Sequence, residues 1–386
     1  MLSILTLLLI STEMTVLSPE DAVRAALLND PTLAAQRANL DAAAGQRGSN
    51  RFLGHNPEVT ASSTRDRSRQ TGSITQPLSI TGEGIFAVRS SSAGLQSARA
   101  SLERARFETA AATRMAYART VLSRELVRLA EEDQALLARL RGIAEARVAV
   151  GEGVDLDLRL ARLEQARALS AWLEAHAQAS QADIELSALI GTKPGELARD
   201  PLAPAPADLG VGAPRSDLIA ASAATRAARA ALSRERAAIL PAVGFGVFYE
   251  KNAGEEIVGP AMTLEIPLWN WNQAGIGTAR GELRIAEAVE RSTAARAATE
   301  ESRAVERLKV AEEALAALVP DIRAEAAPAL RAIEGLFGSG EANLSETLLM
   351  RARVVEGQRA WFEARAAVAA ARIDIALSRQ SAGLLP

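Results

Sequence analysis

The chain has 386 residues, a formal net charge of −3, two histidines and no cysteine. The lack of cysteine excludes disulfides, thiolate metal sites and a cysteine nucleophile, and the small net charge provides no strong positive field for nucleic acid. Aromatic residues make up only 3% of the chain, whereas alanine, leucine, arginine and glutamate dominate. This composition is typical of long helices that pack through small side chains.

The first 16 residues form an apolar lead segment. Leu2–Ile10 has the length of the apolar region of a signal peptide, but it is shorter than the roughly 18 residues of a transmembrane helix. Because no basic residue precedes it, we expect residues 1–16 to be a signal or lead segment whose true start lies upstream of Met1. The alternative is an apolar lead-in to the first helix.

The two halves of the chain carry matching motifs in the same order, about 190 residues apart. Thr75–Leu78 corresponds to Glu265–Leu268, and Gly151–Asp157 corresponds to Gly340–Glu346. Each half therefore predicts a helix, two short strands, a long helix, a glycine turn and a second long helix.

The first repeat covers residues 17–191, with strands expected at about 57–64 and 71–78. Residues 84–150 contain no proline and predict one long helix, which reverses at a turn near Gly151. Apolar side chains recur in this helix at every seventh position, which favours coiled-coil packing. These positions are Met115, Leu122, Leu129, Leu136, Ile143 and Val150.

A proline-rich linker or equatorial segment, residues 192–214, joins the halves. The second repeat covers residues 215–382, with strands expected at about 241–250 and 258–268 and a helical hairpin that turns near Gly340.

Two features distinguish the second repeat. In its last strand Met262, Leu264 and Ile266 alternate with polar residues, as expected between lipid and a wet lumen. The first-half strands are much more polar, so two soluble hairpins that cap a helical bundle remain an alternative. Pro320 and Pro328 are expected to interrupt the long helix of the second repeat.

Two hairpins supply four strands, which are too few to close a barrel. An open sheet edge in lipid leaves backbone groups unsatisfied, so strands that span a membrane would require several chains. Three copies would give 12 strands, within the range of outer-membrane barrels, and a ring of 12 long helices. The predicted fold is therefore mainly α with a small β part. Its long helical hairpins would form a trimeric periplasmic α-barrel, and its four strands would contribute to a 12-stranded transmembrane β-barrel.

The motifs together resemble the TolC family of outer-membrane efflux factors over about residues 17–382. The matching stretches are Leu17–Val23, Asn29–Pro31, Gln76–Leu78, Leu186–Gly191, Ile266–Leu268 and Asn272–Gly275, with the two Gly-Glu turns. The stretch from Pro267 to Gly275 is most similar to the heavy-metal cation branch of the family.

This resemblance implies a homotrimer in the bacterial outer membrane, in contact with outer-membrane lipid and with its helical part in the periplasm. It implies a passive conduit for small molecules or metal cations, without a cofactor or an enzymatic activity. A periplasmic adaptor protein would connect the conduit to an inner-membrane transporter, which supplies the energy. No nucleic-acid partner is expected.

The resemblance also assigns roles to particular residues. Adaptor docking would use the helical tips, which comprise Gly151, Glu152, Gly153, Gly338, Ser339, Gly340 and Glu341. Glu346 and its first-half counterpart Asp157 would line the pore aperture, while Pro77 and Pro267 mark the strand-to-helix turns. The alternatives are local: the glycines close the hairpins, and the carboxylates stabilise the first turns of helices.

Two other functions would explain part of the sequence. A periplasmic or soluble coiled-coil scaffold or adaptor would explain the helices but not the duplicated strand pairs. An all-helical lyase would need converging acid, base or nucleophilic groups, and His55 and His176 are isolated in sequence. We therefore expect no catalytic, cofactor or metal site.

Overall fold

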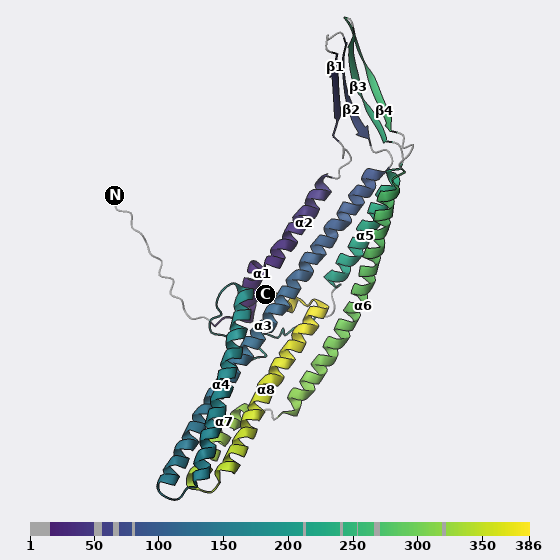
Figure 1. Ribbon diagram of the computed structural model, residues 1–386. Coiled ribbons are helices and arrows are strands. Elements are labelled where there is room, and N and C mark those ends of the chain that lie inside the picture. The colour runs from purple at the N-terminus through teal and green to yellow at the C-terminus, as the bar shows by residue number, and fades with distance from the viewer. Residues whose placement is uncertain are drawn as a thin grey trace, which may run out of the picture. The chain divides into compact units, whose positions relative to one another are not determined.

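The computed structural model describes residues 16–49, 56–64, 69–78, 82–210, 214–239, 242–252, 254–265, 271–318 and 322–386. These residues form eight α-helices, a short 3-10 helix and a four-stranded sheet (Figure 1). The chain divides into two compact units. Unit 1 comprises residues 1–30, 106–213 and 299–386, and unit 2 comprises residues 31–105 and 214–298.

The sheet lies in unit 2 and has the strand order β1-β2-β3-β4, with every neighbouring pair antiparallel. Its strands are β1 (Glu58–Ser63), β2 (Arg69–Leu78), β3 (Ala242–Asn252) and β4 (Glu255–Glu265). The prediction of four strands in two hairpins is confirmed. The second hairpin turns more tightly than expected, because Gly254 adopts a φ of +102° that lets the two strands continue to within two residues of each other.

Four helices or helix parts complete unit 2. They are α2 (Pro31–Ser49), the beginning of α3 (Glu83–Ala149), α5 (Ser216–Ala237) and the beginning of α6 (Gln273–Ala317). Small side chains allow α3 and α5 to approach closely. Ser90 Oγ donates to the Ala227 carbonyl at 3.0 Å and Ser97 Oγ donates to the Ala220 carbonyl at 2.9 Å.

Unit 1 contains two helical hairpins (Figure 1). The end of α3 and α4 (Asp155–Ile190) form one hairpin, and α7 (Ile322–Ser339) and α8 (Leu344–Arg379) form the other. Helix α1 (Pro19–Asn29) and the 3-10 turn η1 (Ala382–Leu384) complete the unit with the end of α6. Within the described residues, no helix combines the length and the apolarity needed to cross a membrane.

The two hairpins share an apolar core. Its buried members are Leu136, Leu137, Leu140, Ala144, Ala161, Ala168, Phe337 and Leu344, which come from α3, α4, α7 and α8. Leu136 belongs to the predicted seven-residue period and is 2% exposed, whereas Val150, at the end of that period, is 71% exposed. The apolar core therefore ends before the hairpin turn that follows the last residue of α3.

The expected proline interruption is only partly present. Helix α6 ends at Ala317 and α7 begins at Ile322, on either side of a segment that includes Pro320 and lies outside the described residues. Pro328 does not interrupt the chain, because it lies inside α7. Proline removes one backbone hydrogen bond, and burial of Ile333 and Phe337 holds the remainder of α7 in place.

Buried polar contacts tie the chain termini of unit 1 to its linker. The Tyr117 hydroxyl donates to the Leu17 carbonyl at 2.6 Å and accepts from the Ala198 amide at 3.1 Å. Arg114 is 3% exposed and donates to the carbonyls of Leu384 and Pro204, both at 3.0 Å.

Candidate functional sites in the sheet and at the helical tips

One face of the sheet is apolar and exposed. Side chains alternate between the faces of a strand, so the strand register defines which residues share a face. The apolar members are Val59, Ala61, Ile74, Leu78, Val243, Phe245, Val247, Tyr249, Val258, Pro260, Met262 and Leu264. Phe245, Val258 and Met262 are 51%, 68% and 67% exposed. An apolar surface of this extent is typical of contact with lipid or protein rather than water.

The opposite face is polar. The Thr60 and Ser73 hydroxyls are hydrogen-bonded at 2.7 Å across β1 and β2, and so are those of Ser62 and Thr71. Gly246 lies on this face in β3, and a Cβ there would lie 1.9 Å from the Ile74 carbonyl oxygen. The sheet thus has the alternation of a strand between lipid and a water-filled lumen.

The sheet is open at both edges. Within the described strands, β1 pairs only with β2 and β4 pairs only with β3. Each edge therefore presents backbone donors and acceptors that must find partners if the sheet lies in lipid. In a single chain, no further described strand can supply those partners.

Pro77 and Pro267 were predicted to mark the two strand-to-helix turns, and only the first of them lies within the described residues. Pro77 is the penultimate residue of β2 and pairs with Gly244, while Pro267 lies outside the described residues. After the second turn, Asn272 adopts a φ of +52° and its Nδ2 donates to both the carbonyl and the carboxylate of Glu235, at 3.0 and 2.8 Å. This hydrogen bond to the carboxylate, with a second from Arg234, lowers the pKa of Glu235. The contact fixes the start of α6 against the end of α5.

Three glycines of the two predicted tips close the hairpins of unit 1, whereas Gly338 lies inside α7 with open space where a Cβ would lie. Gly151 and Gly340 adopt φ values of +79° and +81°, in the left-handed region that favours glycine. Gly153 is equally constrained, since a Cβ there would lie 2.8 Å from the Val148 amide nitrogen. The local role proposed as an alternative for these glycines is therefore present in the structure.

Arg147 connects the two tips. It lies near the end of α3, donates from Nη1 to the Phe337 carbonyl at 3.3 Å, and places its guanidinium 5.6 Å from the centre of the Phe337 ring. A Cβ on Gly340 would lie 3.5 Å from Arg147 Nη2. The structure thus brings the tips together at one end of unit 1. Their other members, Glu152, Gly338, Ser339 and Glu341, are all exposed.

The predicted aperture carboxylates lie in the first turns of two helices. The Glu346 side chain closes a capping box on α8: its Oε2 accepts from the Asn343 amide at 3.3 Å, and Asn343 Oδ1 accepts from the Glu346 amide at 2.8 Å. Asp157 lies in the first turn of α4 and is partly exposed. The described contacts place neither residue beside the other.

Sequence reasoning missed a partly buried ion cluster between α3, α4 and α8. Arg351 Nη1 lies 3.2 Å from Asp133 Oδ1, and its Nη2 lies 4.0 Å from Glu164 Oε2. Burial raises the pKa of Asp133, and the charge of Arg351 partly opposes that rise. One signal was available: Asp133 occupies a core position of the heptad pattern, four residues after Leu129.

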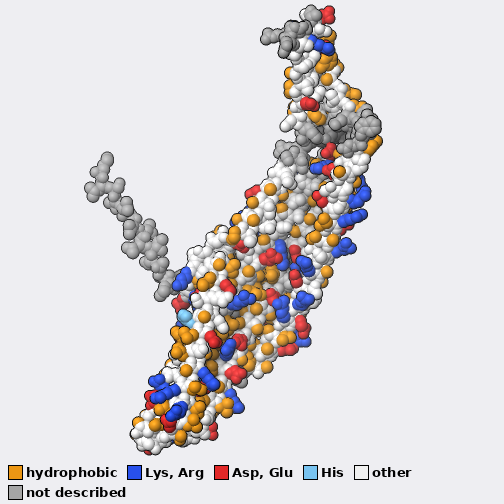
Figure 2. All heavy atoms as spheres, viewed as in Figure 1, with side chains coloured by type: hydrophobic (Ala, Val, Ile, Leu, Met, Phe, Trp, Pro, Cys, Tyr) orange, Lys and Arg blue, Asp and Glu red, His pale blue; other side chains and the backbone are white. Residues whose placement is uncertain are grey.

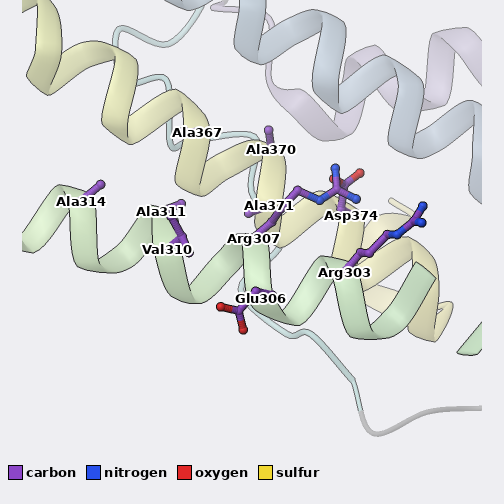
Figure 3. Close-up of a pocket in the computed structure, with 10 residues that line it drawn as sticks. All are labelled: Arg303, Glu306, Arg307, Val310, Ala311, Ala314, Ala367, Ala370, Ala371 and Asp374. Atoms are coloured by element: carbon purple, nitrogen blue, oxygen red, sulfur yellow. The ribbon is translucent and has the colours of Figure 1, made fainter. Parts of the chain in front are cut away.

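A groove in unit 1 lies between α6 and α8 (Figure 3). It encloses about 730 Å³ and is lined mainly by Val310, Ala311, Ala314, Ala367, Ala370 and Ala371. Arg307 pairs with Asp374 at 2.7 Å on its wall, and burial raises the pKa of Asp374. Its lining contains no histidine, serine or lysine, so it holds no recognisable nucleophile with a base. Across the described part of the chain, no three acidic or histidine side chains converge on a metal site.

Comparison with known proteins agrees with this geometry. Residues 22–192 match the family model described as outer membrane efflux protein. The resemblance to the outer-membrane efflux factors is confirmed. Among curated proteins, no sequence matches this chain.

Solved structures extend the likeness to nearly the whole chain. A membrane protein from Pseudomonas aeruginosa aligns with a TM-score of 0.77 at 18% identity, over 93% of this chain and 89% of that chain. CusC aligns with a TM-score of 0.77 at 16% identity, over 93% and 92% of the two chains. The Campylobacter jejuni CmeC outer membrane channel aligns with a TM-score of 0.75 at 16% identity, over 93% and 85%. At these identities the alignments establish the fold.

Two earlier alternatives lose their support. Residues 22–192 match an outer membrane efflux family rather than a soluble scaffold, adaptor or enzyme family. The description of the matched family and the names of two of the aligned structures refer to the outer membrane.

Proposed function

We propose that three copies of this chain form a passive channel through the outer membrane, through which an inner-membrane transporter exports small molecules or metal cations. The observation that carries this proposal is the four-stranded sheet, with one apolar face and two unpaired edges. Joining the β1 edge of one copy to the β4 edge of the next satisfies both edges in lipid. Three copies of four strands make a 12-stranded barrel.

The helices support the same assembly. Helix α4 exposes Leu156, Leu163, Leu173 and Ile184, which are between 54% and 67% exposed. Leu156, Leu163 and Ile184 fall on one seven-residue period, the spacing of a coiled-coil seam. Figure 2 shows hydrophobic side chains at the surface of the helices, between charged ones. We assign this stripe to contact with a neighbouring protomer.

The paired tips are proposed as the docking point for a periplasmic adaptor. Residues 151–153 and 338–341 lie at the same end of unit 1, joined through Arg147 and Phe337, and most of them are exposed. An adaptor that grips both tips would connect the channel to the transporter and could act on both hairpins together. The channel itself then needs no cofactor and no catalytic group.

Glu346 and Asp157 are proposed as aperture residues, each repeated three times in the assembly. A ring of like charges attracts cations and repels itself, which would bias opening. Glu346→Gln removes the charge while retaining a side chain that can complete the capping box, whereas Glu346→Ala removes both. If the charge acts at the aperture, both variants should raise the passive single-channel conductance. A change in the alanine variant alone would assign Glu346 to the helix cap only.

Metal cations and other small molecules are the two alternative classes of cargo within this proposal. The resemblance of the stretch from Pro267 to Gly275 to the heavy-metal branch favours metal cations. A host that lacks the chain should become more sensitive to its cargo, so survival in graded copper, silver, zinc and drug series identifies the class.

The first test separates inner and outer membranes and then measures the mass of the detergent-solubilised protein. Recovery with the outer membrane at about three times the chain mass of 40.7 kDa is expected, together with conductance in planar bilayers. A soluble monomer that forms no channel would overturn the proposal.

A further inference from the structure

We infer that Glu58 sets the ionic preference of the membrane part of this channel, as a ring of three carboxylates that favours hydrated cations. The inference rests on the proposed trimeric channel and adds a selectivity-determining residue within the sheet, remote from the helical aperture.

The register places Glu58 on the polar face. Glu58 in β1 pairs with Thr75 in β2, Thr75 pairs with Gly246 in β3, and Gly246 pairs with Ala261 in β4. These residues form one layer across the sheet, on the side opposite the apolar face that carries Val59. Glu58 is exposed, so its carboxylate faces water on the side that would line the lumen.

The other members of that layer leave Glu58 as its dominant side chain. Thr75 is only 7% exposed, Gly246 has no room for a Cβ, and Ala261 ends at its methyl group. Among the described strand residues of this layer, Glu58 alone carries a charge and alone reaches beyond Cγ. Its carboxylate therefore determines the potential at this depth.

The adjacent layers of the polar face are uncharged. Toward the helices lie Pro77, Gly244 and Thr263, and toward the strand turns lie Thr60, Ser73, Phe248 and Gly259. No described residue forms an ion pair with Glu58. The nearest acidic positions on this face are two layers away on either side: Glu250, which is paired with Arg69 at 2.9 Å, and Glu265 at the end of β4.

Closing the barrel with three copies places three unpaired carboxylates around one level of the lumen. Low-dielectric walls focus the field of such a ring into the water between them. Three unit charges at about 10 Å from the axis, screened at 0.1 M salt, change the cation-to-anion permeability ratio by roughly fivefold. The effect should grow as the salt concentration falls, because the screening length increases.

The test measures reversal potentials of single channels in a KCl gradient for wild type, Glu58→Gln and the control Glu256→Gln. The control substitution removes the same charge from the opposite face of the sheet. Glu256 lies near the strand turn there and pairs with Lys251. We expect Glu58→Gln to lower the permeability ratio by roughly fivefold and Glu256→Gln to change it little. An unchanged ratio in Glu58→Gln channels of normal conductance would overturn the inference but leave the proposed channel intact. If wild type forms no channel, both fail.

Chemical rescue provides an independent readout, because the chain contains no cysteine. In Glu58→Cys channels, a negatively charged methanethiosulfonate should restore the cation preference, and a positively charged one should reverse it. This comparison is made within one assembled channel, so it does not depend on the folding of different variants. A thiol that reacts with neither reagent from the aqueous side would place position 58 away from the lumen and refute the inference.

Discussion

Replacing Arg114 with alanine should release the C-terminal turn from the rest of unit 1. Arg114 donates from Nε and Nη1 to the carbonyls of Leu384 and Pro204, both in buried residues. Its Nη2 donates to Glu20, whose side chain is 47% exposed, and to the carbonyl of Gly383, which is also partly exposed. Water can solvate Glu20 and Gly383 after the substitution, but it reaches the two buried carbonyls poorly. A buried carbonyl without a donor costs about 1–3 kcal/mol, so the pair costs about 4 kcal/mol, equivalent to about 10³-fold in the opening equilibrium.

Hydrogen exchange of the detergent-solubilised full chain measures this local opening. The amides of Leu384 and Leu385 are suitable reporters, because they donate to the carbonyls of Ser381 and Ala382 at 3.1 Å. We expect their exchange to accelerate by about 10³-fold in Arg114→Ala. Arg119→Ala, an exposed position on the same helix, should leave it unchanged. If Arg114→Ala exchanges at the wild-type rate, the buried arginine does not hold this turn and the reasoning is refuted.

Three further predictions follow from the contacts in the two units. Gly246→Ala should prevent β2 from pairing with β3 and abolish trimers in the outer membrane, because its Cβ would lie 1.9 Å from a backbone oxygen. The control Gly72→Ala should assemble normally, because its Cβ would lie 3.8 Å from the nearest neighbouring atom. Asp133 should lower the free energy of unfolding of the wild type as the pH rises from about 3.8 through its raised pKa, because the folded state retains the proton longer than the unfolded chain. Urea titrations at several pH values should show that this pH-dependent loss of stability disappears in Asp133→Asn. Leu163→Glu should reduce the trimer fraction in detergent by placing a charge in the exposed stripe of α4, and an unchanged oligomer mass would exclude that stripe from the seam.

The periodicity of the sequence predicted the helices and strands of this fold better than it predicted which of them pack or pair together. The second pair of strands was visible because Met262 and Leu264 alternate with polar residues, and the glycine turns were visible because two halves repeat them. The pairing of β2 with β3 joins segments about 170 residues apart, and no local pattern encodes a contact across that distance. Pro328 was assigned the wrong effect for a related reason: its intrinsic helix-breaking cost is local, whereas the packing that outweighs it comes from the tertiary structure.

Buried polar contacts were the least accessible part of the sequence. Arg114 looks like any arginine on a helix surface until the linker and the C-terminal turn are placed over it. Asp133 could be recognised as a charge at an apolar heptad position, but its partner Arg351 is 218 residues away. Ionic partners are set by which helices adjoin, and that arrangement is a property of the whole fold.

The local and the assembled roles of Glu346 are compatible, and its hydrogen bonds show how. The capping box engages Oε2 with the Asn343 amide, an interaction that pins the side chain at the start of α8. A pinned carboxylate loses less conformational freedom when three of them are brought together, so a cap can prepare a residue for an aperture. The same geometry that explains Glu346 within one chain therefore supports its use in a ring, and the contrast between glutamine and alanine at this position separates the two contributions.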